Sequence, residues 1–228
     1  MFATGIYRGA SEINAAMGRV YGHMFLAVIT SMIVSAVVGT NPVLMAFFFT
    51  GIMKWVVLLA PLVFVFLVPV LLNAGLPKIG KVLTLHAFAA LMGLSFSAIF
   101  AIFTMGSIVG AFMGAAILFG VMSLYGYFTK QSLDSIGKYL FVALIAIIIV
   151  SIVNLFIGSS VLQMVLSAVS VLVFLGLTAY DTQQIREIVS VDNDDSVEIM
   201  GALTLYLDFI NLFINLLQLF GVMKGNDD

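Results

Sequence analysis

The last apolar run of the chain opens with Gly201-Ala202-Leu203-Thr204-Leu205-Tyr206-Leu207-Asp208-Phe209-Ile210-Asn211 and continues to Met223. A run of this length is enough for a helix to cross the hydrocarbon core of a bilayer. Within it, Asp208 places a carboxyl group where insertion costs roughly 2.5–3.5 kcal/mol even on the mildest scale. Polar residues recur at intervals that put them on one helix face, namely Thr204, Asp208, Asn211, Asn215 and Gln218. Because lipid cannot satisfy such a face, the pattern predicts a last helix enclosed by the rest of the protein.

The composition of the whole chain is that of a membrane protein. Hydrophobic residues make up 63% and charged residues 9% of the 228 positions, and the mean hydropathy is +1.22. A soluble domain is about half apolar and about a quarter charged. We therefore expect an all-α polytopic membrane protein, with residues 1–228 forming a single domain of seven transmembrane helices and the last helix central. The predicted spans are Val20–Gly39, Ile52–Leu72, Val82–Phe103, Ile108–Phe128, Tyr139–Ile157, Val161–Tyr180 and Gly201–Met223.

Basic residues predict the orientation of these spans. With the N-terminus in the cytoplasm, the inner side carries Arg8, Arg19, Lys78, Lys81, Lys130, Lys138 and Arg186, and the outer side only Lys54 and Lys224. Seven spans then place the C-terminus outside. The first run has no small-residue cleavage site, so we interpret it as a span and not as a signal peptide. A net charge of −2 and the lack of cysteine give no footprint for nucleic acid, disulfides or cysteine-bound metals, and we expect no cofactor.

A second acidic residue, Asp181, closes the preceding apolar run, with Thr178 one helical turn before it. An antiparallel return of the chain would bring Asp181 and Asp208 together near the cytoplasmic mouth. Two carboxylates in contact at low dielectric cannot both ionise cheaply, so the pair would share a proton and sense pH. Without that proton, the same oxygens would suit Ca²⁺. Two simpler interpretations stay open: Asp181 as an interfacial helix end, and Asp208 as a permanently protonated structural donor.

Two further patterns have structural interpretations. The acidic stretch from Asp192 to Glu198 fails as an EF-hand loop, because Val197 and Leu203 occupy the glycine and glutamate positions, so we interpret it as a solvated hairpin. The small-residue repeat Gly106, Gly110, Gly114 is typical of close helix packing.

Two segments of the chain resemble signature segments of the Bax inhibitor-1 family, and they are Gly176-Leu177-Thr178-Ala179-Tyr180-Asp181-Thr182-Gln183 and Gly201 to Phe213. The stretch Met122-Ser123-Leu124-Tyr125-Gly126-Tyr127 is similar to one in bacterial members. The resemblance implies seven helices with the last one central. It also implies a pH-sensitive calcium leak in which Asp181 and Asp208 act as the sensor. The short N-terminus and small loops are similar to those of bacterial members, so the resemblance implies a bacterial cytoplasmic (inner) membrane protein.

The leading functional hypothesis is therefore a passive cation leak, with Ca²⁺ as the permeant ion. Asp181 and Asp208 would be the gate and the candidate Ca²⁺ contacts, and the pathway would be lined by Thr178, Thr204, Asn211, Asn215 and Gln218. An alternative is a membrane-embedded modulator that binds a protein partner such as a membrane quality-control protease. A third possibility is an intramembrane aspartyl protease. Tyr180-Asp181 fits that class, but Leu205-Tyr206-Leu207-Asp208 lacks the Gly-x-Gly that should precede the second aspartate.

Overall fold

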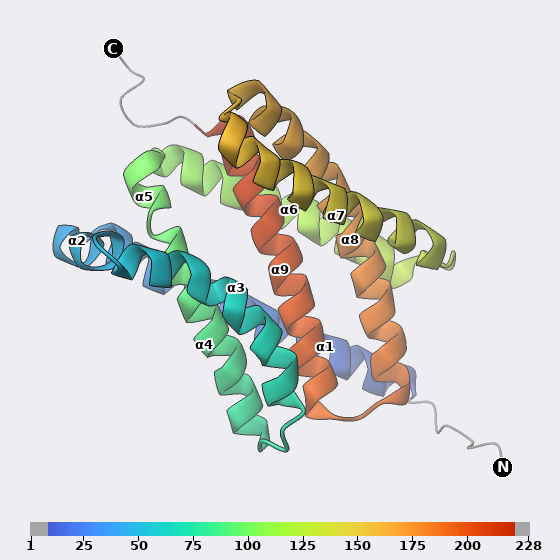
Figure 1. The fold of residues 1–228 in the computed structure, drawn as a ribbon. Coiled ribbons are helices and arrows are strands. Elements are labelled where there is room, and N and C mark those ends of the chain that lie inside the picture. The colour runs from blue at the N-terminus through green and yellow to red at the C-terminus, as the bar shows by residue number, and fades with distance from the viewer. Residues whose placement is uncertain (1–8, 222–228) are drawn as a thin grey trace. The chain divides into compact units, whose positions relative to one another are not determined.

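The computed structural model describes residues 9–221, and the regular structure within that range is almost entirely α-helical (Figure 1). Seven helical segments in this range are long and apolar enough to cross a bilayer, which confirms the predicted fold class. Two short helices, α2 and α5, are not spans by themselves. The helices are α1 (Ala10–Gly39), α2 (Pro42–Phe49), α3 (Met53–Leu72), α4 (Lys78–Phe96), α5 (Ile99–Ile102), α6 (Met105–Phe128), α7 (Asp134–Ile157), α8 (Ser160–Val191) and α9 (Asp195–Phe220).

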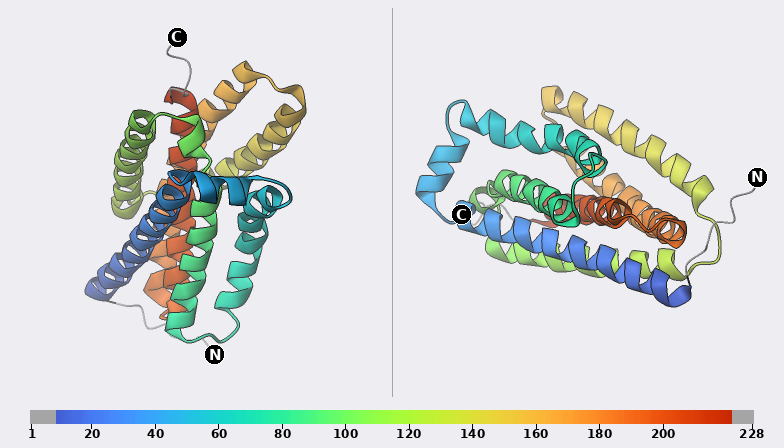
Figure 2. Two further views of the ribbon diagram at one scale, coloured as in Figure 1. Left: turned by 90° about the vertical axis from the view of Figure 1, so that its left-hand side faces the viewer. Right: turned by 90° about the horizontal axis from the view of Figure 1, so that it is seen from below.

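The described residues fall into two compact units, each visible from two further directions in Figure 2. Unit 1 comprises residues 9–103 and 188–206, and unit 2 comprises residues 104–187 and 207–221. Helices α8 and α9 therefore contribute residues to both units. The assignment of the chain to a single domain stays a prediction. Three predicted features, Arg8, Lys224 and the end of the last run at Met223, lie outside the described residues.

Unit 1 is organised around a close crossing of α1 and α4. A Cβ at Gly93 of α4 would lie 2.5 Å from the backbone oxygen of Ser31 in α1, so only glycine permits this approach. The Ser31 hydroxyl lies 2.7 Å from the backbone oxygen of Ala89 and 2.6 Å from the Tyr206 hydroxyl of α9. Both side chains are buried. One serine therefore connects three helices where the backbones are closest.

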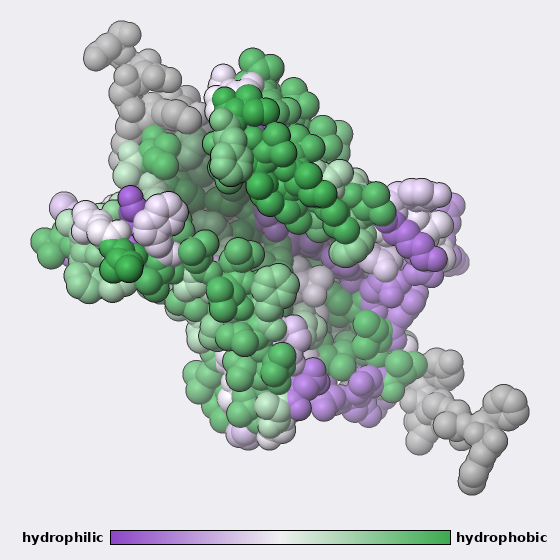
Figure 3. Space-filling model, viewed as in Figure 1, coloured by the Kyte–Doolittle hydropathy of each residue, from purple (hydrophilic) through white to green (hydrophobic). Residues whose placement is uncertain are grey.

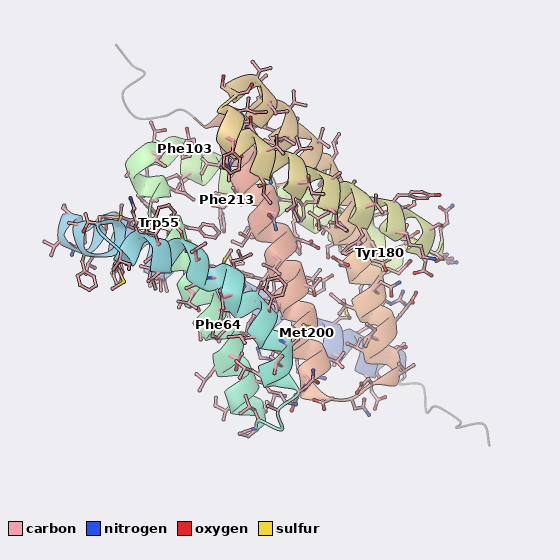
Figure 4. All side chains as sticks on the ribbon, viewed as in Figure 1. Trp55, Phe64, Phe103, Tyr180, Met200 and Phe213 are labelled. Carbon is pink, nitrogen blue, oxygen red and sulfur yellow. The ribbon has the colours of Figure 1, made fainter. Side chains whose placement is uncertain are left out.

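Unit 2 uses glycines in the same way around α8. Gly126 of α6 faces the backbone of Ala179, and a Cβ there would overlap the Ala179 carbonyl oxygen. Gly137 of α7 faces the ring of Tyr180, which Figure 4 labels on α8. Both contacts lie within five residues of Asp181, so they fix the part of α8 that carries it. On the α9 side of the unit, Phe112 of α6 packs edge-on against Phe209 and Phe213.

The spans differ strongly in how much of their surface is covered. Only 6% of the apolar window of α7 is buried, whereas α9 reaches 67%, the largest share of the seven. The prediction of an enclosed last helix is therefore confirmed. Figure 3 shows an apolar surface along α7 that becomes hydrophilic toward its N-terminal end, as expected for a helix that meets lipid along its length and water at its end.

Candidate functional site

The candidate site lies within unit 2 and centres on Asp208 of α9. Its side chain is buried, with 4% of the residue exposed. Within the described part of the chain, no amide, hydroxyl or cationic group donates a hydrogen bond to its Oδ2 atom. The group that reaches Asp208 is another carboxyl, because the side chains of Asp181 and Asp208 lie within hydrogen-bonding range of each other. A hydrogen bond between two carboxyl groups requires a proton on one of them.

The position of Asp181 corrects one expectation from the sequence. Asp181 does not close its helix, because α8 continues for ten residues to Val191. Asp208 follows the start of α9 at Asp195 by thirteen residues. At about 1.5 Å per residue, each carboxyl lies roughly 15–20 Å along its helix from the turn that joins α8 to α9. The interpretation of Asp181 as a residue that ends a helix at the interface is therefore wrong.

Neighbours on α8 hold Asp181 in place. The Thr182 hydroxyl lies 3.0 Å from the hydroxyl of Ser123 in α6. The Gln183 side chain accepts a hydrogen bond from the backbone N–H of Leu133 at 2.8 Å and donates one to the backbone oxygen of Gln131 at 2.9 Å. The residues that follow Asp181 are thus attached to both α6 and the α6–α7 connection. This attachment restricts rotation of α8, so Asp181 keeps its orientation toward α9.

The residues predicted to line a pathway behave in two ways. The threonine hydroxyls and asparagine amides donate to their own helices one turn back: Thr178 to Phe174, Thr204 to Met200, Asn211 to Leu207 and Asn215 to Asn211. Thr204 belongs to unit 1, whereas the other three are in unit 2. Gln218 makes contacts between helices, because its Oε1 accepts hydrogen bonds from Gln163 and Ser167 of α8, each at 2.8 Å. The structure thus brings together Asp181 with Asp208, and Gln218 with α8.

Sequence reasoning missed Gln163 and Ser167. A signal for them was present, because the residues at 163, 167, 170, 178 and 181 follow helical spacing and are polar. Phe174 interrupts this series and hides it. The Asn154 amide of α7 donates to the backbone oxygen of Ser159 and to the Gln163 side chain, so it connects α7 to α8.

The acidic segment at the start of α9 differs from its prediction. We expected a solvated hairpin, but three of its four acidic residues are ion-paired within unit 1. Asp194 contacts Lys81 at 2.6 Å, Asp195 contacts Lys78 at 2.7 Å, and Glu198 contacts Arg19 at 2.6 Å.

Asp194 lies in the connection between α8 and α9, and its ion pair with Lys81 changes its pKa. The Lys81 ammonium, together with the Ser196 backbone N–H, lowers the pKa of Asp194 to about 2. No three histidine, cysteine or acidic residues among the described positions are grouped so that they could hold a metal ion. The acidic segment therefore serves as an electrostatic link to α1 and α4.

Together, the fold and the site define an integral membrane protein of seven spans with a pair of carboxyl groups, one of them buried, on its last two helices. The family model for "Inhibitor of apoptosis-promoting Bax1" matches residues 13–226, so the chain belongs to the Bax inhibitor-1 family. It is 38% identical over 225 residues to the inner membrane protein YbhL of Escherichia coli (strain K12), covering 95% of each chain. It is 37% identical over 213 residues to an uncharacterized protein of Rickettsia prowazekii (strain Madrid E), covering 90% of this chain and 88% of the relative.

Proposed function

We propose that this protein is a pH-sensitive passive leak for cations, with Ca²⁺ as the permeant ion and Asp181 with Asp208 as the gate. The observation that carries the proposal is the contact between two carboxyl groups, one of them buried, within unit 2. A carboxyl at membrane depth normally finds a cation, a cavity or a proton. Since no cationic partner reaches Asp208 within the described residues, a shared proton accounts for the contact.

Gating follows from the two charge states of the pair. With one proton, the carboxyls are hydrogen-bonded and hold α8 against α9. Without it, two negative charges repel each other in a medium that screens them weakly. That repulsion favours separation of the helices, and it also favours a divalent cation between the carboxylates. Two carboxylates offer four oxygens, fewer than the six to eight ligands that Ca²⁺ prefers, so water would complete the shell and the ion would leave readily.

The location proposed for this activity is a bacterial inner membrane, in line with the name of the Escherichia coli relative. The basic residues favour a cytoplasmic N-terminus and an outer C-terminus. Lys78, Lys81 and Arg19, all assigned to the cytoplasmic side, meet the same acidic segment in unit 1. This shared contact supports placing them on one side of the membrane.

The test is calcium flux into proteoliposomes that contain an indicator dye, measured between about pH 5 and 8. Wild type should show flux that depends on pH. Asp208→Asn and Asp181→Asn should each remove the pH dependence, because an amide cannot exchange a proton. The matched control is Asp134→Asn, an exposed acidic residue of unit 2 that accepts a hydrogen bond from Gln184. Background flux in wild type that does not change with pH or with Asp208→Asn would contradict the proposal.

Two further experiments separate this function from its rivals. A partner-binding modulator would produce no calcium flux in liposomes, and a membrane protein of its host would co-purify with it in a stoichiometric amount. An aspartyl protease would cleave a model transmembrane substrate and lose that activity in Asp208→Ala.

A further inference from the structure

A second group of polar side chains lies on the same faces of α8 and α9 as the aspartates, toward the other ends of these helices. Gln218 of α9 accepts from the Gln163 amide and from the Ser167 hydroxyl. Ser167 is buried, with 1% exposed, whereas Gln163 and Gln218 are exposed. The group therefore reaches from the interior of unit 2 to its surface.

The group and the aspartate pair are connected by continuous helix faces. On α9 the face runs through Asp208, Asn211, Asn215 and Gln218, at intervals of three or four residues. On α8 it runs through Gln163, Ser167, Ser170, Phe174, Thr178 and Asp181, again at intervals of three or four. The contact of Asp181 with Asp208 and the hydrogen bond from Ser167 to Gln218 show that these faces are turned toward each other.

The two contacts lie at different depths along the helix pair: the aspartates within it, and the Gln218 group at the end away from the α8–α9 turn. Gln218 is ten residues from Asp208, or about 15 Å along α9, and Ser167 is fourteen residues from Asp181, or about 21 Å along α8. Gln163 is in the first turn of α8 and Gln218 in the last turn of α9, where a span meets the membrane surface. Amide and hydroxyl oxygens are ligands for hard cations and carry no charge of their own.

We propose that Gln163, Ser167 and Gln218 form an uncharged second cation contact, at the mouth of the pathway farther from the turn that joins α8 to α9. This inference rests on the proposed function and adds to it the residues of that mouth. The competing explanation is a purely structural set of hydrogen bonds, which would stabilise the packing of α8 on α9 and would not contact an ion.

A charge placed at Gln218 distinguishes the two explanations by the sign of its effect. The chain has no cysteine, so Gln218→Cys can be modified after folding and reconstitution with thiosulfonate reagents of either charge. In water at physiological salt, a unit charge about 5 Å from the ion changes the local concentration of a divalent cation about fourfold and of a monovalent cation about twofold. The anionic adduct should raise calcium flux by about fourfold and the cationic adduct should lower it by a similar factor.

The control is Val161→Cys, two residues from Gln163 and about 200° around α8, at an exposed position of the same helix end. Its adducts should leave the flux unchanged. The response of the flux to pH should persist in the Gln218 adducts, because both aspartates are unaltered. If both Gln218 adducts change flux in the same direction, or no more than the Val161 adducts do, the second contact is wrong, even though Asp208→Asn still abolishes the pH response. Loss of that response in wild type itself would instead overturn the proposed function, and this inference with it.

Discussion

The ion pair between Arg19 and Glu198 gives an asymmetric prediction about stability. Arg19 of α1 donates to both carboxylate oxygens of Glu198, at 2.6 and 2.8 Å. The two side chains differ in access to water, because 44% of the Arg19 side chain is exposed but only 5% of Glu198. Removing either partner therefore leaves a very different residue behind.

The exposures set the magnitudes. Arg19→Met leaves a buried, unpaired carboxylate, and breaking a buried pair costs about 3–5 kcal/mol. Because Arg19 is partly exposed, water can replace it in part, and we expect Arg19→Met to lower the free energy of unfolding by about 2–3 kcal/mol. Glu198→Gln leaves a guanidinium that hydrates and an amide oxygen that still accepts, so we expect about 1 kcal/mol. In the double variant no buried charge is left, and the loss should be about 1 kcal/mol in place of a sum of about 3–4.

The assay is equilibrium unfolding in mixed micelles with increasing SDS, followed by circular dichroism of the helices. Lys78→Met is the control, because Lys78 and Asp195 are 53% and 38% exposed, and such surface pairs contribute about 0–1 kcal/mol. Equal losses from Arg19→Met and Glu198→Gln, or a double variant that loses the full sum, would refute the argument from burial.

Three other predictions concern single positions. Gly126→Ala should destabilise the protein by about 1–3 kcal/mol because its Cβ would overlap the α8 backbone, whereas Gly120→Ala, which meets nothing within 4 Å, should be neutral or stabilising in the same unfolding assay. The depressed pKa of Asp194 means that its stabilising contribution is complete above about pH 4 and is lost as the pH falls from the ordinary value of 3.8 through about 2; Lys81→Met should flatten the pH dependence of the unfolding midpoint in that window. Tyr206→Phe removes one buried hydroxyl partner and should lower the free energy of unfolding by about 1 kcal/mol, since the serine hydroxyl on α1 keeps its carbonyl acceptor.

Hydropathy predicted which segments are spans but not where their helices begin and end. Helix α1 begins at Ala10, not near Val20, and α8 ends at Val191, not near Tyr180. The reason is that an apolar run marks only the part of a helix that lies in hydrocarbon. Polar residues such as Asp181 and Thr182 can continue the same helix, because α-helices satisfy their backbone groups internally in either solvent.

Glycine spacing was a poor guide to helix contacts. The repeat of Gly106, Gly110 and Gly114 predicted close packing, but a Cβ at Gly106 or Gly110 would meet nothing within 4 Å among the described residues. The close approach is at Gly126 instead. A small residue permits two backbones to meet, yet it does not determine which partner helix arrives there. That choice depends on contacts distant in sequence, such as the hydrogen bond between Ser123 and Thr182.

The two polar faces show why one half of the candidate site was evident in the sequence and the other was not. On α9, five polar residues at helical spacing stand among leucine, phenylalanine and isoleucine, so their common face is plain in the sequence. The α8 face is broken by Phe174, which is itself buried with 7% exposed, so its polar members look like isolated residues. Only the contacts at both levels, Asp181 with Asp208 and Ser167 with Gln218, join them into one face. If these faces line a pathway, Phe174 is its one bulky apolar member between the two contacts, and helix separation at the aspartates must also move this ring before a hydrated cation can pass.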